Sequence, residues 1–165
     1  MLLTIFLAIV FCAAMALMLI SCVAFIQDNR SFSSAPKEAR DALIQREKEL
    51  FYGARAIGWT LFLISVLMIL GVGAVAIWDG IRSGFTFGQF FLRFVLIFTI
   101  YKLCDMVLID NFLLLKFHFF QYYYPEAAHA MEGRKYGFNI KSQLLKLLAI
   151  FPALSALAAW LCTLF

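Results

Sequence analysis

The sequence predicts an all-α, polytopic membrane protein with four transmembrane helices. Of its 165 residues, 64% are hydrophobic and 15% are charged, whereas a soluble domain is about half apolar and about a quarter charged. Long uncharged runs recur, and most charged residues gather in two segments between them. The formal net charge of +4 is explained by attraction to anionic lipid headgroups and by the control of membrane topology. Binding to nucleic acid is disfavoured because no basic–aromatic module of a nucleic-acid reader is present.

The first span is predicted over residues 2–26, since no charged side chain precedes Asp28 and about 20 apolar residues suffice to cross a bilayer. No Lys or Arg precedes the run, so a cleaved signal peptide is disfavoured, and the lipoprotein-like box ending at Cys22 lacks its basic flank. A stripe of small residues recurs every fourth position and suits close helix packing. Its members are Thr4, Ala8, Cys12 and Ala16.

The polar segment over residues 27–55 is expected to contain a cytoplasmic or interfacial helix. Ser34 is a candidate cap, with Pro36 in the first turn, and the helix formers continue from Lys37 to Leu50. Ala39, Leu43 and Leu50 would then share one face. The helix is either a solvated or interfacial one that leads into the second span, or it docks a partner.

The second span is predicted over residues 56–78, with Trp59 and Trp78 near its ends, where aromatic belts lie. Gly71 and Gly73 inside it favour a close helix approach or a kink. A short turn follows from Asp79.

The third span is predicted over residues 88–113, within an apolar segment that continues to Tyr124. As one helix this segment would be ~50 Å long, longer than the ~30 Å hydrocarbon core. It must therefore tilt, break or protrude, and Pro125 is its expected stop.

A second polar segment over residues 114–146 and a fourth span over residues 147–165 complete a single membrane domain, residues 1–165. The basic residues concentrate in the two polar segments, and the chain ends carry none. The positive-inside rule therefore places both polar segments in the cytoplasm and both termini outside the cell membrane.

The third span contains charges that form a candidate polar intramembrane site: Arg93, Lys102, Asp105 and Asp110. Each costs roughly 2.5–3.5 kcal/mol on insertion scales, which makes such residues candidates for function. Arg93, like Lys116 beyond the site, is expected to snorkel to headgroups as an anchor. Lys102 and Asp105 are three residues apart and are expected to pair. The pair either makes insertion tolerable or forms an ion, proton or headgroup site. Asp110 lies roughly 140° round the helix from Asp105, so the two carboxylates do not share a face.

Four residues near the cytoplasmic boundary form a candidate headgroup-binding patch: His118, His129, Arg134 and Lys135. No H-x-x-x-H spacing or nucleotide-binding motif occurs, so no metal and no cofactor is expected. The four cysteines lie in apolar segments without a C-x-x-C pair, and burial as small hydrophobes is favoured. They are Cys12, Cys22, Cys104 and Cys162.

Three short runs resemble a group of small uncharacterised bacterial four-helix membrane proteins. The runs are Asp105 to Phe112, Tyr124-Pro125-Glu126, and Tyr136 to Lys141. Asn111 stands where that group has Trp, and Asn139 where it has His. The resemblance covers about residues 102–145; it implies a four-helix protein of a bacterial inner membrane and transfers no activity.

The leading functional hypothesis is a non-enzymatic integral membrane protein that binds a membrane partner or moves a small solute or ion through a polar bundle interior. Its expected partners are membrane lipids and a membrane protein or a second copy of the chain. The alternative is a membrane-embedded enzyme acting on lipid at the cytoplasmic interface, built from Asp110, Glu126 and the headgroup patch. A purely structural subunit is the third possibility.

Overall fold

The computed structural model describes residues 1–28, 37–44, 46, 48–131 and 140–164, and over these ranges it consists of helices and connecting turns without a strand. The first rod is α1 (Leu2–Ile20), continued by a π-helix (Ser21–Ile26); the second is α3 (Ala54–Arg82). The third is α4 (Phe87–Cys104), continued by a π-helix (Asp105–Lys116). The fourth comprises α7 (Ile140–Leu145), a π-helix (Lys146–Ile150) and α8 (Phe151–Cys162). The short elements are α2 (Lys37–Asp41), α5 (Phe119–Tyr123), a 3₁₀ turn (Pro125–Ala127) and α6 (Ala128–Met131).

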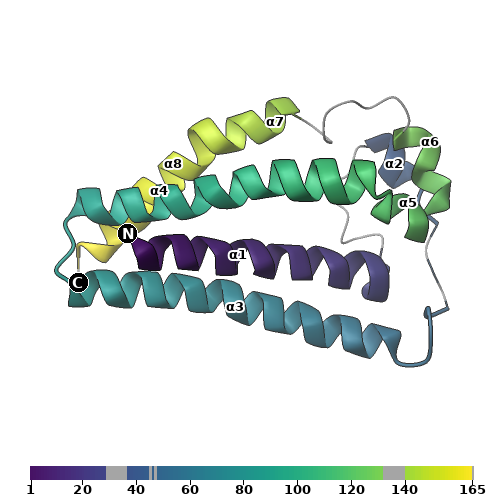
Figure 1. Ribbon diagram of the computed structural model, residues 1–165, viewed down its shortest axis with the longest axis horizontal. Coiled ribbons are helices and arrows are strands. Elements are labelled where there is room, and N and C mark those ends of the chain that lie inside the picture. Colours follow the sequence, from purple (N-terminus) through teal and green to yellow (C-terminus); the bar gives the residue numbers. More distant parts are fainter. Residues whose placement is uncertain (29–36, 45, 47, 132–139, 165) are drawn as a thin grey trace.

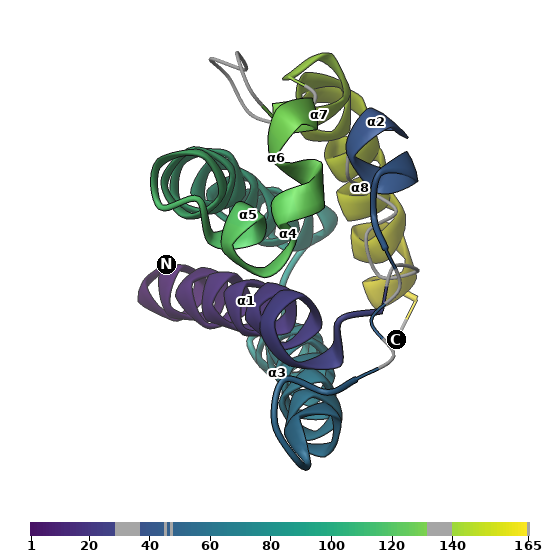
Figure 2. The same cartoon turned by 90° about the vertical axis from the view of Figure 1, so that its right-hand side faces the viewer.

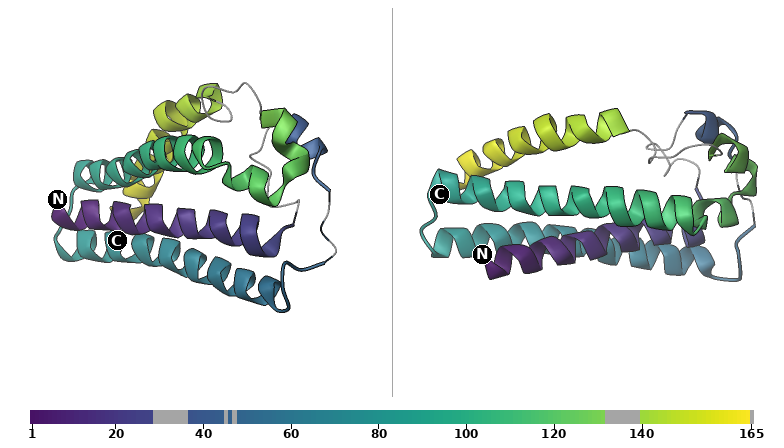
Figure 3. Two further views of the ribbon diagram at one scale, coloured as in Figure 1. Left: turned by 45° about the vertical axis from the view of Figure 1, so that its right-hand side comes forward. Right: turned by 45° about the horizontal axis from the view of Figure 1, so that its top comes forward.

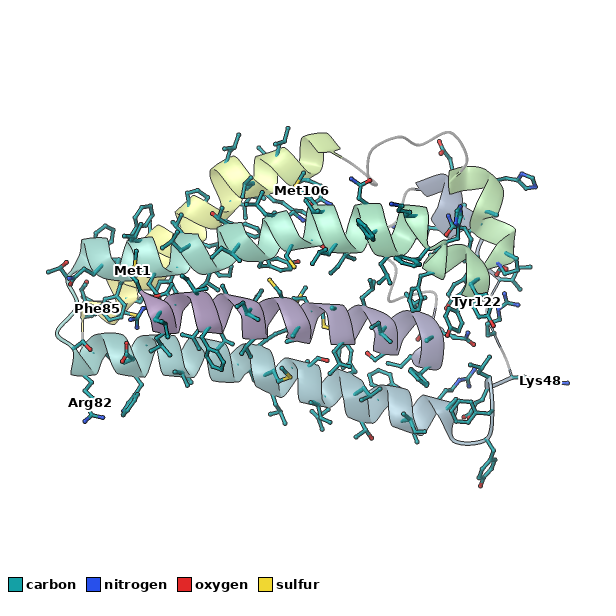
Figure 4. All side chains as sticks on the ribbon, viewed as in Figure 1. Met1, Lys48, Arg82, Phe85, Met106 and Tyr122 are labelled. Atoms are coloured by element: carbon teal, nitrogen blue, oxygen red, sulfur yellow. The ribbon has the colours of Figure 1, made fainter. Side chains whose placement is uncertain are left out.

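The four rods are arranged as a row in which α3 packs on α1, α1 on α4 and α4 on α8 (Figures 1 and 2). The neighbours α1 and α4 run in the same direction, and α3 and α8 run opposite to them (Figure 1). Met1, Arg82 and Phe85 lie at one end of the rods, and Lys48 and Tyr122 lie at the other (Figure 4). We call these the Met1 end and the Tyr122 end.

At the Met1 end, all four rods contribute to one apolar core. It contains Leu7, Ala8, Val72, Ala76, Phe90, Phe94, Ile97, Ala159 and Cys162. Of the predicted small-residue stripe on α1, Thr4 and Ala8 are buried, at 3% and 0% exposure. The stripe therefore does permit close packing at this end.

At the Tyr122 end, the fourth rod diverges from the third, and α2, α5 and α6 gather beside the ends of α1 and α4 (Figure 3). A second core here contains Val23, Ile109, Phe120, Tyr124 and Ala127. The two ends are thus held by separate cores.

Three of the described helices are long and apolar enough to cross a membrane: Leu2–Ile26, Ala54–Arg82 and Gln143–Cys162. They correspond to the predicted spans 2–26, 56–78 and 147–165. The rod Phe87–Lys116 is not among them, although its 18- and 12-residue parts give it a length of about 45 Å at 1.5 Å per residue.

The third rod ends at Lys116, so the apolar segment breaks, one of the three expected outcomes, and it breaks before Pro125, the expected stop. His118 adopts a left-handed backbone conformation with φ 51°, and a single such residue interrupts a helix. The Phe117 N–H closes the last turn by donating to the Phe112 carbonyl at 2.9 Å. Pro125 instead begins the 3₁₀ turn, where its fixed φ is accommodated.

The expected helix from Lys37 to Leu50 is also corrected: among the described residues of that range, the helix covers Lys37–Asp41. The Ala42 and Leu43 N–H groups still donate to the carbonyls of the preceding turn, but two later N–H groups donate to side chains. The Ile44 N–H donates to Glu126 at 3.4 Å and the Gly53 N–H donates to Glu49 at 2.9 Å. Ser34 and Pro36, the expected cap, lie outside the described residues.

The glycine prediction in α3 is wrong as well. The helix continues unbroken through Gly71 and Gly73, and a Cβ at either would meet nothing within 4 Å. The close approaches occur at Gly58, where a Cβ would lie 2.8 Å from Phe25 and Ile26, and at Gly80, where it would collide with the Phe90 ring. Small residues are therefore required at the two ends of α3, where it meets other elements.

Candidate intramembrane polar site

The candidate site is centred on Lys102 and Asp105, near the midpoint of the rod Phe87–Lys116. Lys102 is in the last turn of α4, and Asp105 begins the π-helix that continues it. The Lys102 ammonium donates to the Asp105 carboxylate at 2.5 Å. The predicted pairing is confirmed.

The two partners differ in burial. The Lys102 side chain is 4% exposed, whereas the Asp105 side chain is 17% exposed. A buried ammonium requires a partner because an isolated charge in a low-dielectric interior is strongly disfavoured. Asp105 both neutralises Lys102 and presents the open side of the pair.

The ring of Tyr101 lies beside Lys102 and is itself packed by two further aromatic rings. The Lys102 ammonium lies 5.9 Å from the centroid of the Tyr101 ring. That ring is fixed edge-on against Phe11 of α1, at 5.0 Å, and tilted against Phe151 of α8, at 6.3 Å. The site is therefore positioned by three of the four rods.

The backbone hydrogen-bonding pattern changes at the same place. From Asp105 to Lys116 the rod is a π-helix, a rare form that otherwise occurs mostly as single-turn bulges, frequently at functional sites. The change of winding falls on one of the charged residues. Nothing in the sequence pattern predicted it.

Two cysteines adjoin the pair. Cys12 of α1 lies close enough to Cys104 and to Asp105 for electrostatic interactions. Burial as separate small hydrophobes was the favoured interpretation of these cysteines. Their juxtaposition depends on the register of α1 against α4, which the spacing of residues in one sequence does not reveal.

Arg93 does not belong to this site, and its predicted role as a snorkelling anchor is not what the structure shows. Its side chain is 4% exposed and donates to Asp79 at 2.7 Å and to the Ala76 carbonyl at 2.8 Å. Its guanidinium also lies 4.3 Å from the centroid of the Phe85 ring. Arg93 turns inward because the α3–α4 hairpin brings Asp79 to it, and it lies about 14 Å along the helix from Lys102.

The remaining charges of the rod contribute less. The Asp110 side chain lies outside the described part of the structure. Lys116 is exposed and lies 4.8 Å over the Phe112 ring, an arrangement compatible with the predicted anchoring role.

The predicted headgroup patch is only partly described. His118 and His129 are exposed, on separate elements, while Arg134 and Lys135 lie outside the described residues. Among residues 1–28, 37–44, 46, 48–131 and 140–164, no group of three His, Cys, Asp or Glu side chains could hold a metal ion.

A different cluster holds the Tyr122 end together. Arg46 pairs with Glu126 at 2.8 Å, donates to the Tyr123 carbonyl at 3.2 Å and lies 5.8 Å over the Tyr124 ring. Burial raises the pKa of the Tyr124 phenol above its usual range. This cluster joins the two polar segments, and sequence reasoning missed it because its members are 77 to 80 residues apart.

No family model, curated protein or solved structure matches this chain.

Proposed function

We propose that this chain is a non-enzymatic integral membrane protein of four spans, with Phe87–Lys116 as the third. Three rods have the length and apolarity to cross a bilayer, and the third rod lies between two of them in the row. Its Lys102 and Asp105 neutralise each other, which lowers the cost of placing them at membrane depth. The positive-inside rule then directs the Tyr122 end to the cytoplasm and both termini outward.

The orientation is tested with an impermeant maleimide on intact cells. Lys48→Cys reports the Tyr122 end and Arg82→Cys reports the Met1 end, and both positions are exposed. Labelling of Arg82→Cys alone is expected. Labelling of Lys48→Cys alone would show the opposite orientation, with the Tyr122 end outside the cell.

The proposed activity is the binding and movement of a proton or small ion at the Lys102–Asp105 pair. The observation that carries this proposal is the place and surroundings of the pair: a buried ammonium near the midpoint of the rod, held by one carboxylate of the same rod that remains partly open. A proton or cation that reaches Asp105 would release Lys102, and its departure would restore the pair. Buried ionisable pairs in spans are the usual elements of proton relays.

The test is proton and cation flux into proteoliposomes that contain the purified protein and a pH-sensitive dye. Asp105→Asn is expected to abolish flux, and Lys102→Met to impair it. Lys116→Gln, an exposed charge on the same rod, is the matched control and should retain flux. Flux equal to that of empty liposomes with folded wild-type protein would overturn the proposal.

Association with a membrane protein or a second copy is the second candidate function, and the row arrangement favours it. The rod α3 forms one end of the row and exposes Leu63, Leu67 and Leu70, at 58%, 58% and 63%. These residues lie on one helical face. Crosslinking in native membranes through a cysteine placed at Leu67 distinguishes lipid from a protein neighbour, because only the latter gives a larger species.

Lipid-directed catalysis at the Tyr122 end is less well supported. Its candidate carboxylate Glu126 is engaged by Arg46, and the two histidines lie on separate elements. Membrane lipids are proposed as the medium that surrounds the spans and not as substrates.

A further inference from the structure

The fourth rod is packed against the bundle along only part of its length. Ala159 and Cys162 of α8 belong to the core at the Met1 end. The buried residues of the core at the Tyr122 end come from the first and third rods and from α5 to the 3₁₀ turn, and among the described residues none comes from the fourth rod. The segment Ile140–Ile150 instead diverges from the π-helix Asp105–Lys116 (Figure 3). We call these two segments the fork.

Both arms of the fork present apolar side chains that the other arm does not cover. Leu144 and Leu148 are 44% and 74% exposed on the fourth rod, and Val107 and Leu108 are each 54% exposed on the third. In a bilayer such side chains contact lipid tails, which are as apolar as leucine. Exchanging those contacts for contacts between the arms therefore changes the free energy little, so an open and a closed fork are both accessible.

The fourth rod has a hinge where the fork begins. The Phe151 N–H donates to the Lys146 carbonyl, five residues back, which closes the π-turn Lys146–Ile150. Pro152 follows in the first turn of α8, and it has no N–H to donate to the preceding turn. Prolines and π-bulges are the usual places where helices bend sharply. The rod therefore bends most easily between Ile150 and α8.

The base of the fork lies beside the ion pair. Phe151 stacks on Phe98 at 5.3 Å and lies tilted against Tyr101 at 6.3 Å. Asp105 follows Tyr101 by four residues, so it is on the same helical face, one turn beyond this contact. Its side chain is 17% exposed. The partly open carboxylate is thus at the place from which the fourth rod diverges.

We propose that Ile140–Ile150 is a gate that bends at the π-turn and Pro152 and controls the approach to Asp105 from the Tyr122 end. This inference rests on the proposed ion site, whose carboxylate the gate covers. In the closed position the leucines of the gate pack on the third rod and exclude water from the pair. In the open position Asp105 exchanges its proton or ion. The four-rod core blocks the opposite approach, from the Met1 end.

The test measures distances across the fork by double electron–electron resonance of spin labels. The protein is placed in lipid nanodiscs after its four native cysteines are replaced by Ala, and the labels are attached at Leu108→Cys and Leu144→Cys. A bend of ~20° at Phe151 moves position 144, seven residues or about 10 Å away, by ~3–4 Å. Two distances, or one broad distribution of that width, are expected.

The matched reference pair is Leu92→Cys with Leu157→Cys, on the same two rods at the Met1 end, where both side chains are also about half exposed. This pair should give one narrow distance, and it reports whether each variant retains the fold. A fork distribution as narrow as that of the reference pair would overturn the gate.

The hinge is tested with Pro152→Ala, which restores the missing N–H and should narrow the fork distribution to one distance. Pro125→Ala is the matched control, because Pro125 lies in the 3₁₀ turn outside the rods and should leave the distribution unchanged. A distribution that stays broad in Pro152→Ala would overturn the assignment of the hinge.

The link to the ion pair is tested with two further variants. Asp105→Asn leaves the Lys102 ammonium without its counter-charge, and a buried charge then requires water, so the longer distance should gain population. Lys102→Met/Asp105→Leu removes that requirement, so the shorter distance should gain population. Unchanged populations in both variants would overturn control of the approach to Asp105.

The spin labels report motion and not flux, so the two proposals fail separately. A moving gate in a protein that gives no proton or cation flux would overturn the ion site alone. Flux through a protein whose fork is rigid would overturn the gate alone.

Discussion

Two ion pairs lie on the same rod, and they connect different parts of the molecule. Arg93 reaches across to Asp79 on α3, at 2.7 Å, and Lys102 reaches one turn along its own rod to Asp105, at 2.5 Å. The first pair joins two helices that the chain must fold together. The second joins residues that any helix brings together, so it contributes little to the arrangement of the rods.

The surroundings of the two cations reinforce this contrast. Arg93 has a carboxylate, the Ala76 carbonyl and the Phe85 ring around its guanidinium. Lys102 has Asp105 and, more distantly, the Tyr101 ring. A cation with fixed partners on a neighbouring helix is a structural element, whereas one held by a single carboxylate of its own rod is suited to a binding cycle.

The largest expected effect is on the structural pair. Arg93→Leu should lower the free energy of unfolding by about 3–5 kcal/mol, because removal of one partner leaves the other charge unpaired. Equilibrium unfolding in mixed detergent measures it. The double variant with Asp79→Leu should be less damaged, and Arg82→Leu, an exposed arginine at the same end, is the control. A loss at Arg93 no larger than at Arg82 would contradict the structural role.

The second prediction concerns Lys102 and Asp105. Lys102→Met should cost about 2 kcal/mol, the scale of a hydrogen bond to a charged group, and less than Arg93→Leu because Arg93 also donates to the Ala76 carbonyl and so joins α4 to α3 twice. The double variant Lys102→Met/Asp105→Leu should be closer to wild type, since only apolar surface remains. Equal damage from the single and double variants would show that the residues act separately.

The contrast also explains what the sequence could predict. Local relations were predictable: the i,i+3 pairing of Lys102 with Asp105 and the apolar rods at 2–26 and 56–78 follow from helical periodicity. The partner of Arg93 was not, because it depends on how the α3–α4 hairpin closes. Snorkelling was inferred for Arg93 from depth alone, and the neighbouring helix changed the outcome.

The same limit applies to the Tyr122 end and to the cysteines. Arg46 meets Glu126, and Cys12 meets Cys104, across large sequence separations. The helix break at His118 was missed for another reason: the residue in the left-handed conformation is neither Gly nor Asn, which would have signalled it. Proline was the visible stop signal, and it lies seven residues further on.

The third prediction concerns the pair at the Tyr122 end, which joins two segments as Arg93 does but is more exposed. Arg46 is 34% and Glu126 15% exposed, and such pairs contribute about 1 kcal/mol or less. Arg46→Gln should therefore reduce the free energy of unfolding by that amount at low salt and by less at 1 M salt, where the screening length falls to ~3 Å. Lys48→Gln is the exposed control. A loss independent of salt would assign the effect to the Tyr123 carbonyl bond.

The smallest effect at neutral pH is expected for Tyr124→Phe, and it becomes visible only in alkali. Burial raises the pKa of Tyr124 in the folded protein, while the unfolded value stays near ~10. Above pH ~10 the unfolded state therefore loses the proton that the folded state retains, and stability falls as pH rises through the window between the two pKa values. The Phe variant lacks this proton, so its free energy of unfolding should decline less steeply above pH ~10 than that of the wild type.

Tyr122→Phe is the matched control, because Tyr122 is 80% exposed and should follow the wild-type curve. Parallel alkaline curves for wild type and Tyr124→Phe would show that the Tyr122 end opens before its phenol titrates. This core would then be the weaker of the two that hold the rods.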